Sequence, residues 1–229
     1  MKPFKLFTLY GITTSITLVS LGSFALCGIA LAWLLARRDF WGKSVLDAAV
    51  HLPLVLPPVV TGYLLLLTFG RRGLVGAWLA DNLGIVFAFR WTGAALACGI
   101  MSFPLLVRPI RLSIEAVDRR LEQAASTLGA APWRVFATVT LPLALPGVLA
   151  GMVLGFAKAI GEFGATITFV SNIPGETQTI SSAIYSLIQT PDGDTAAARL
   201  VLISIMIAMG ALIASEAFAR RATKRLHGN

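Results

Sequence analysis

The chain has 229 residues, of which 56% are hydrophobic and only 13% are charged. Because soluble domains carry about 25% charged residues, this composition excludes an ordinary soluble protein and predicts an integral membrane protein. The net charge of +8 would favour nucleic acid in a soluble protein. Basic residues in short loops beside apolar segments instead set membrane topology, so we expect no nucleic-acid partner.

Five apolar blocks are each long enough for the roughly 20 residues that a helical membrane span requires. They lie at residues 11–36, 45–69, 85–107, 143–160 and 197–218. The pattern predicts an all-α integral membrane protein with about five transmembrane helices, in a single domain that covers residues 1–229. The first block follows Lys2 and Lys5, as in a secretory signal. It is too long and lacks a small-residue cleavage site, so we expect it to stay as a span.

The second block contains three prolines, Pro53, Pro57 and Pro58, close to His51. Each proline removes a backbone donor and clashes with the preceding turn, which predicts a bend or break in this helix. Broken helices often border a transport path, although a kink that only improves packing fits these residues equally well. We interpret His51 as a hydrogen-bonded structural residue rather than a proton carrier.

The interval 119–142 predicts two short helices joined at an elbow, between the third and fourth blocks. One face of the first helix collects its apolar residues at helical spacing: Leu121, Ala124, Ala125 and Leu128. Gly129 can adopt the left-handed conformation of a helix C-cap, and Pro132 suits the first turn of the next helix. A helix this short cannot cross a bilayer, so we expect its apolar face to dock on something outside the hydrocarbon.

Residues 158–176 (KAIGEFGATITFVSNIPGE) place charges at membrane depth. Lys158 and Glu162 are four residues apart and share a helix face, where they can neutralise each other. One interpretation is an internal ion pair that orients helices. The other is a pore-lining site, with bends at Gly161 and Gly164 and with hydroxyl groups for a passing solute. These hydroxyl groups belong to Thr166, Thr168 and Ser171.

About twice as many basic residues fall on the side of the elbow and the carboxyl end as on the other side, with Lys158 at membrane depth. Since positive residues favour the cytoplasm, the amino end is expected outside, and the elbow and the carboxyl end are expected inside. Residues 171–195 are then expected to form an outer loop with an amphipathic segment.

Motifs that carry catalysis or bind cofactors are not found. Residues 42–44 (GKS) resemble the end of a phosphate-binding loop, but Arg37 stands where that motif needs glycine. No GxSxG, HExxH or clustered Cys/His pattern occurs, and Cys27 and Cys98 lie separately inside apolar runs. We therefore expect no enzyme activity, metal or cofactor, and any ATP hydrolysis would belong to a separate subunit.

Glu122, Ala124, Ala125 and Gly129, followed by residues 139–142 (VTLP), form a spaced pattern. It resembles the EAA motif of bacterial ABC-importer permeases, written EAA, three residues, G, nine residues and I-x-LP. Gln123 within the triplet and Val139 in place of Ile are departures that alter neither the helix nor the elbow. The resemblance implies a type I ABC-importer permease fold, in which region 115–142 is the cytoplasmic coupling helix and its elbow. The residues implied to couple to an ATPase are Glu122, Ala124, Ala125, Leu128 and Gly129.

Residues 52–58 (LPLVLPP), 161–166 (GEFGAT) and 172–177 (NIPGET) resemble the molybdate and sulfate branch of that family. The last segment favours molybdate; sulfate or thiosulfate and tungstate are alternatives. The resemblance implies a homodimer in the bacterial inner membrane, surrounded by lipid, with the pathway along its twofold axis. Two ATPase subunits and a periplasmic oxyanion-binding protein are the implied partners. The implied path or gate residues are Lys158, Glu162, Phe163, Gly164 and Thr166.

A secondary transporter driven by an ion gradient is the rival from another mechanistic class. It would need internal repeats and paired broken helices in two halves, and five spans with a single elbow do not divide in that way. In the importer hypothesis, ATP binding draws two ATPases together, and the elbow transmits their motion to the spans. Co-purification with an ATPase separates the two hypotheses.

Overall fold

The structure is a computed structural model that describes the backbone of residues 3–227 and the side chains of residue 9, residues 11–210 and residues 212–213. Within residues 3–227 every regular element is helical, which confirms the predicted all-α fold. The elements follow in the order α1 (Pro3–Arg37), α2 (Lys43–Val55), α3 (Pro58–Phe69), α4 (Leu74–Leu83), α5 (Trp91–Ala116), α6 (Arg119–Thr127), α7 (Pro132–Val135), the π-helical segment η1 (Phe136–Thr140), α8 (Leu141–Ile160), α9 (Gly164–Val170), α10 (Ile180–Ile188) and α11 (Asp194–His227).

Three helical stretches in the described part of the chain are long and apolar enough to cross a membrane. They are Gly11–Arg37, Trp91–Ala116 and Pro132–Ile160, and they match the first, third and fourth predicted blocks. The bent pair of α2 and α3 adds a fourth candidate, and α11 contains the fifth block. In that block, the side chains of residue 211 and residues 214–218 lie outside the described residues.

The second block is broken, as its prolines predict. α2 ends at Val55, α3 begins at Pro58, and the two helices are bent by 116°. Pro57 and Pro58 carry no N–H, so they cannot continue the hydrogen-bond ladder of α2. Pro58 instead occupies the first position of α3, where the N–H would have no helical partner in any case.

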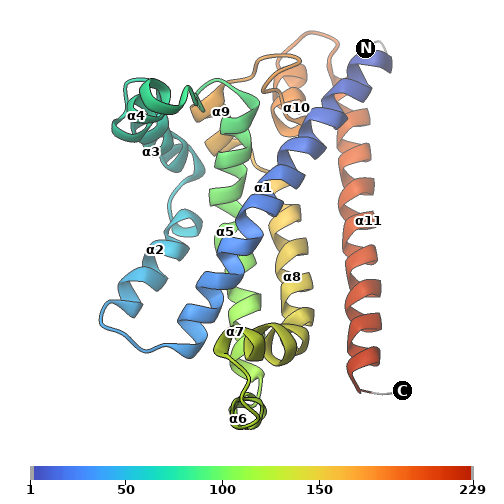
Figure 1. Ribbon diagram of the computed structural model, residues 1–229. Coiled ribbons are helices and arrows are strands. Elements are labelled where there is room, and N and C mark those ends of the chain that lie inside the picture. Colours follow the sequence, from blue (N-terminus) through green and yellow to red (C-terminus); the bar gives the residue numbers. More distant parts are fainter. Residues whose placement is uncertain (1–2, 228–229) are drawn as a thin grey trace.

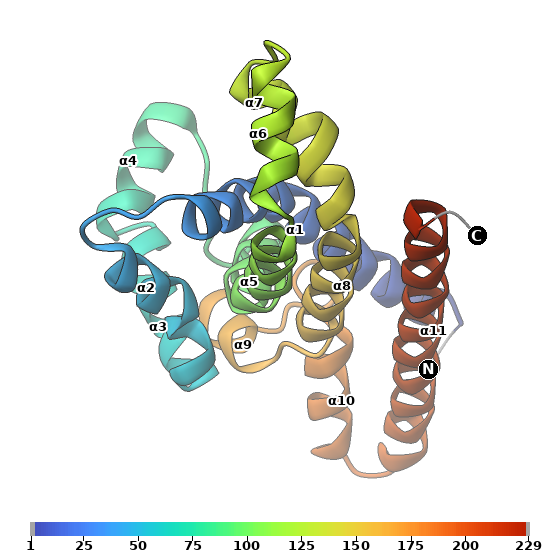
Figure 2. The ribbon, with the colours of Figure 1, turned by 90° about the horizontal axis from the view of Figure 1, so that it is seen from below.

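α5 lies at the centre of the assembly and packs against both α1 and α8 (Figures 1 and 2). α2, α3 and α4 lie to one side of this group and α11 to the other, as Figure 2 shows. Small residues bring the central helices close together. A Cβ atom added at Gly151 of α8 would lie 2.6 Å from the carbonyl oxygen of Leu106 in α5, so only glycine fits this contact.

The short helices gather at the two ends of the assembly (Figure 1). α4, α9 and α10 lie at the end where the chain begins, and α6 and α7 lie at the end where α11 finishes. α6 protrudes beyond the long helices. The start of α1 at Pro3 and the end of α11 at His227 therefore lie at opposite ends of the molecule.

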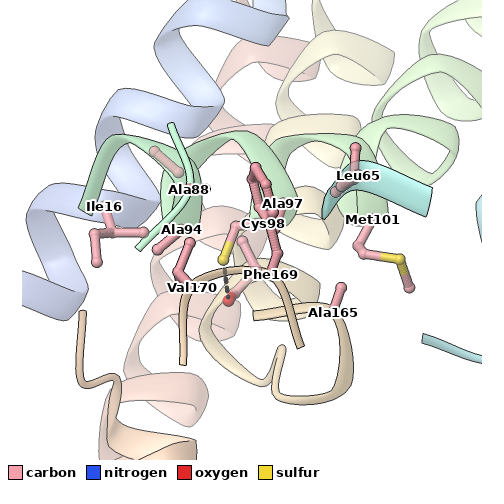
Figure 3. Close-up of a cluster of buried hydrophobic side chains, with 12 residues drawn as sticks. Ile16, Leu65, Ala88, Ala94, Ala97, Cys98, Met101, Ala165, Phe169 and Val170 are labelled. Atoms are coloured by element: carbon pink, nitrogen blue, oxygen red, sulfur yellow. Dashed lines mark hydrogen bonds between the residues drawn. The ribbon is translucent and has the colours of Figure 1, made fainter. Parts of the chain in front are cut away.

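A buried apolar cluster joins α1, α3, α5 and α9 (Figure 3). Its members include Ile16, Leu65, Met101 and Phe169, and the Phe169 ring is fully buried. Burying a side chain of this kind contributes about 1.5–3 kcal/mol relative to leaving it exposed. Since α9 has only 7 residues and would not form alone, this cluster is what fixes it between α3 and α5.

Candidate functional site

α6 is a short helix whose two ends are fixed by local sequence. At its amino end, the Asp118 carboxylate accepts a hydrogen bond from the backbone N–H of Arg120 at 2.9 Å. At its carboxyl end, Gly129 has φ +82°, and the N–H of Ala130 donates to the carbonyl oxygen of Ala125 at 3.3 Å. This is the left-handed cap that the sequence predicts.

The apolar face of α6 is largely uncovered by the described part of the chain. None of the residues of α6 is buried, and Leu121 and the capping Leu128 are 49% and 88% exposed. Ala124 is also exposed, and Ala125 is half-buried. An amphipathic helix presented in this way is suited to a groove on another protein.

The second arm of the elbow differs from the predicted pair of short helices. α7 continues through η1 into α8, so Pro132–Ile160 is one long helical stretch. In η1 the helix widens, because the N–H of Leu141 donates to the carbonyl oxygen of Phe136, five residues earlier. Pro142 explains this widening, since a proline ring clashes with the carbonyl group four residues earlier in a regular α-helix. The elbow is therefore directly continuous with a candidate span.

Glu122 is bonded to the long helices through its side chain. Its Oε1 atom accepts hydrogen bonds from Arg37 Nη2 at 2.9 Å, from Arg37 Nε at 3.2 Å and from Thr140 Oγ1 at 2.6 Å. The side chains of Arg37 and Glu122 are only 8% and 19% exposed. We call Arg37, Glu122 and Thr140 the elbow latch. Arg37 lies 85 residues before Glu122, so no local sequence pattern could have revealed this contact.

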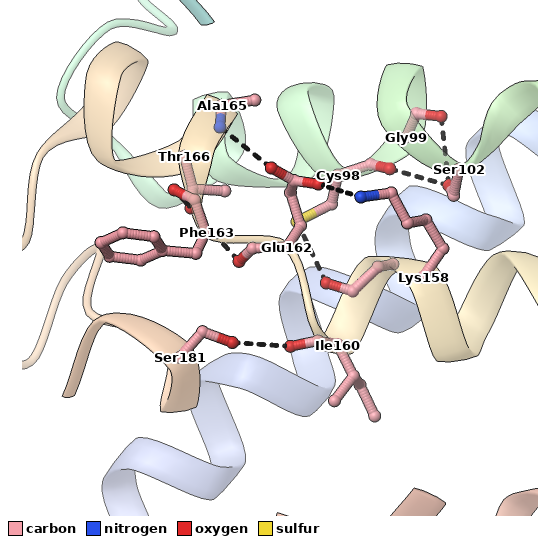
Figure 4. A network of polar contacts seen from close by, with 11 residues as sticks. Cys98, Gly99, Ser102, Lys158, Ile160, Glu162, Phe163, Ala165, Thr166 and Ser181 are labelled. Atoms are coloured by element: carbon pink, nitrogen blue, oxygen red, sulfur yellow. Dashed lines mark hydrogen bonds and ion pairs between the residues drawn. The ribbon is translucent and has the colours of Figure 1, made fainter. Parts of the chain in front are cut away.

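A second polar site surrounds Glu162, in the turn between α8 and α9 (Figure 4). Lys158 Nζ donates to Glu162 Oε2 at 2.6 Å, and Glu162 Oε1 accepts from the backbone N–H of Ala165 at 2.9 Å. The Glu162 side chain is 1% exposed and that of Lys158 is 28% exposed. The carboxylate thereby ties the end of α8 to the first turn of α9, where it satisfies an N–H group that lacks a helical partner.

The other predicted path residues lie around the same turn, and we call residues 158–166 the gate segment. Thr166 is buried, and its Oγ1 donates to the carbonyl oxygen of Phe163 at 2.9 Å. The Phe163 ring is half-buried and lies 4.8 Å from the Tyr185 ring, centroid to centroid. Gly164 lies against α3, where an added Cβ would come within 2.7 Å of the Pro58 Cβ atom.

The gate segment meets the proline break of the second span. α9 packs on α3 so closely that a Cβ atom at Gly62 would lie 2.5 Å from the carbonyl oxygen of Ala165. Two segments that the sequence singles out separately, residues 52–58 and 161–166, are therefore neighbours in space. A movement of either segment must be accommodated by the other.

A third polar site lies between α2 and α5. Arg111 donates to Asp47 Oδ1 and to Glu115 Oε1, both at 2.8 Å, and His51 Nδ1 lies 2.8 Å from the carbonyl oxygen of Asp47. Together with Arg108 these residues line a cavity of about 340 Å³. The contact of His51 agrees with a structural interpretation. Among the described residues, no group of three or more His, Cys, Asp or Glu side chains is placed to hold a metal.

The fold and the protruding elbow define a transmembrane permease subunit of an ABC importer. Residues 28–224 match the family model described as "binding-protein-dependent transport system inner membrane component", and the chain belongs to this family. Its fold is similar to that of a chain in the crystal structure of a bacterial ABC transporter involved in the import of the acidic polysaccharide alginate. That match has a TM-score of 0.75 and 19% identity, and it covers 95% of this chain and 79% of the other. At this identity the likeness concerns the fold alone.

Two relatives are similar over most of their length. The chain is 64% identical over 198 residues to the molybdenum transport system permease protein ModB of Escherichia coli (strain K12), a match that covers 86% of each chain. It is 59% identical over 198 residues to ModB of Haemophilus influenzae, again over 86% of each chain. These matches confirm the predicted class, a multi-pass permease subunit, and the predicted resemblance to the molybdate branch.

Proposed function

We propose that the chain forms the membrane pathway of a molybdate importer, as a homodimer that binds two cytoplasmic ATPase subunits. The observation that carries the proposal is the apolar face of α6, where Leu121 and Leu128 are exposed. The names of the two relatives support molybdate as the ion. Sulfate, thiosulfate and tungstate are the alternatives, since all are oxyanions of similar charge.

In the proposed orientation, the α6 end of the molecule faces the cytoplasm and the α9 end faces the periplasm. The excess of basic residues on the α6 side supports this orientation. The amino end of the chain is then periplasmic and the carboxyl end cytoplasmic, at opposite ends of the molecule (Figure 1). A periplasmic oxyanion-binding protein would deliver its ligand at the α9 end.

The proposed mechanism uses α8 as a lever between the elbow and the gate segment. ATP binding draws the two ATPases together, and α6 moves with the groove that holds it. α8 has 20 residues and spans about 30 Å, and it begins at the elbow and ends next to Glu162. Displacement of its cytoplasmic end therefore tilts the gate segment, which packs on the broken α2–α3 span.

In this mechanism the Lys158–Glu162 pair has a positioning role, and the gate segment forms the periplasmic gate. Glu162 is buried, and its carboxylate bonds both to Lys158 at the end of α8 and to the first turn of α9, so α9 follows the end of α8 as one unit. Phe163, Gly164 and Thr166 would then open or close the path when α9 shifts against α3.

Reconstitution tests the proposed function. The chain is purified with its ATPase, placed in liposomes with the periplasmic binding protein, and assayed for uptake of labelled molybdate. We expect uptake that requires ATP and the binding protein and that persists in excess sulfate. Uptake driven by an ion gradient without ATP would contradict the importer, and preferential uptake of sulfate would contradict the assigned ion.

A matched pair of variants tests the docking surface in the same assay. Ala125→Asp places a charge on the apolar face of α6, so the complex should lose the ATPase and ATP-dependent uptake. Thr127→Asp adds the same charge at an exposed position of α6 that is neither on this apolar face nor in the Glu-Gln-Ala-Ala segment, so it should retain both. Normal uptake by the Ala125→Asp chain would count against docking through this face.

A further inference from the structure

The main-chain connections of α6 to the long helices are short turns. On one side the chain passes from α5 through Val117 and Asp118, and on the other through residues 128–131, which include the left-handed Gly129. Turns of this kind absorb changes in φ and ψ, so they transmit only part of a helix displacement. Packing holds α6 weakly as well, because none of its residues is buried.

The elbow latch supplies a second connection. Glu122 accepts two hydrogen bonds from Arg37, the last residue of α1, and one from Thr140, the last residue of η1. Arg37 Nη2 also donates to the carbonyl oxygen of Val117, at the end of α5, at 3.1 Å. One guanidinium and one carboxylate therefore join α6 to the ends of α1, α5 and the α8 lever.

The setting of the latch favours a lasting contact over a transient surface pair. The two charged side chains are mostly shielded from solvent, so bulk salt screens their attraction less than it screens an exposed pair. The geometry is that of a guanidinium offering two N–H groups to one carboxylate, supplemented by a hydroxyl donor. Glu122 bonds to these groups of its own chain. The docking surface of α6 is therefore formed by the side of the helix that carries Leu121 and Leu128.

We propose that the elbow latch transmits displacement of α6 to α1 as well as to α8, with Arg37 as a positioning residue. The inference depends on the proposed function, since it requires an ATPase that moves α6. Without the latch, α6 still docks, but its motion reaches the bundle only through the elbow backbone. ATP is then hydrolysed with less movement of the spans, and less molybdate is imported for each ATP.

The test measures molybdate uptake per ATP hydrolysed in proteoliposomes that contain the complete complex and the binding protein. The variants are Arg37→Met, Glu122→Gln, and the exchanged pair Arg37→Glu with Glu122→Arg. Arg38→Met is the matched control, because the neighbouring Arg38 guanidinium lies over the Trp33 ring, 5.9 Å from its centroid. Thr140→Val removes only one hydroxyl donor and keeps the test informative if the Arg37 variants fail to accumulate.

We expect the Arg37→Met complex to retain the ATPase and to import about tenfold less molybdate per ATP, within the usual range of coupling between sites. Glu122→Gln should lose a similar amount and Thr140→Val less, whereas Thr140→Ser should match the wild type because serine keeps the hydroxyl donor. The exchanged pair should import more molybdate per ATP than Arg37→Glu or Glu122→Arg alone, and Arg38→Met should match the wild type. Unchanged uptake per ATP in Arg37→Met and Thr140→Val overturns the inference. Loss of the ATPase from the Arg37→Met complex also overturns it, since the latch would then shape the docking surface alone. A wild-type complex without ATP-dependent uptake refutes the proposed function instead.

Discussion

Replacement of Glu162 by alanine should loosen the gate segment, because its carboxylate accepts from Lys158 Nζ at 2.6 Å and from the Ala165 N–H at 2.9 Å. Removing one partner of a buried ion pair costs about 3–5 kcal/mol. The Lys158 side chain is 28% exposed, so its ammonium group can turn toward polar surroundings, and we take the lower end, roughly 3 kcal/mol. For a chain of this size that loss lowers the midpoint of thermal unfolding by about 6–12 °C.

A double variant separates the effect of the two charges from that of the hydrogen bond to the Ala165 N–H. In Lys158→Met with Glu162→Gln, the glutamine oxygen can still accept from the Ala165 N–H, and no charge is left unpaired. Neutral replacements of a buried pair are often close to neutral in stability, so we expect this variant within about 1 kcal/mol of the wild type. Lys158→Met alone strands the carboxylate and should be about as damaging as Glu162→Ala. Adding the Glu162→Gln single variant closes a double-mutant cycle with Lys158→Met and the double variant. If each single variant costs about 3 kcal/mol and the double variant at most about 1 kcal/mol, the coupling energy is about 5 kcal/mol.

Circular dichroism of the purified chains in detergent gives the unfolding midpoints, and the liposome assay gives uptake. We expect both quantities to fall in the single variants and to recover in the double variant. An unchanged midpoint for Glu162→Ala, or a double variant as unstable as the singles, would refute the reasoning. Recovery of stability without recovery of uptake would favour the pore-lining interpretation of this charged pair.

Three further predictions concern other parts of the chain. Gly62→Ala should destabilise the protein by about 1–3 kcal/mol, since its Cβ would lie 2.5 Å from the carbonyl oxygen of Ala165; an unchanged unfolding midpoint would contradict the packing of α3 on α9. Gly129→Pro should abolish ATP-dependent uptake with membrane insertion intact, because φ is +82° there and proline requires about −65°; normal uptake would argue against the elbow. The hydrogen bond and the charge of Lys43 hold the pKa of Asp39 below its usual 3.8. The contribution of this pair to stability is therefore fully present above pH 3.8, and it is lost as the pH falls through the lowered pKa. Asp39 is exposed, so Asp39→Asn should leave the midpoint at pH 7 unchanged, and a clear drop would show that this pair matters more than a surface pair should.

Local chemistry made part of this structure predictable. Gly129 could be assigned as a left-handed cap because glycine has no Cβ atom and adopts positive φ without strain, as the end of a helix requires. The break at Pro57 and Pro58 followed from their missing N–H groups. The contact of Lys158 with Glu162 followed from their spacing of four residues. Each of these features is decided within a few residues of sequence.

Contacts between distant segments were beyond the reach of such reasoning. Arg37 lies 85 residues before Glu122, and only the packing of α1 beside the elbow brings the two together. The meeting of Gly62 with the first turn of α9 likewise depends on how the spans associate. The second arm of the elbow was predicted as a separate short helix, but Pro142 does not interrupt it. The π-helical widening accommodates the proline ring, so the arm continues into α8.

The central claim is that a cytoplasmic ATPase binds the exposed face of α6. Site-specific crosslinking tests this claim most directly. Leu128 is 88% exposed, so Leu128→Cys offers a reactive thiol at this face in a chain whose own Cys27 and Cys98 have been replaced. In membranes that contain the complete complex, we predict that a short bifunctional thiol reagent links this residue to a cysteine introduced into the ATPase, with a yield that changes when ATP binds. Absence of any crosslink to the ATPase, or labelling of the thiol by a membrane-impermeant reagent added outside intact cells, would contradict the account.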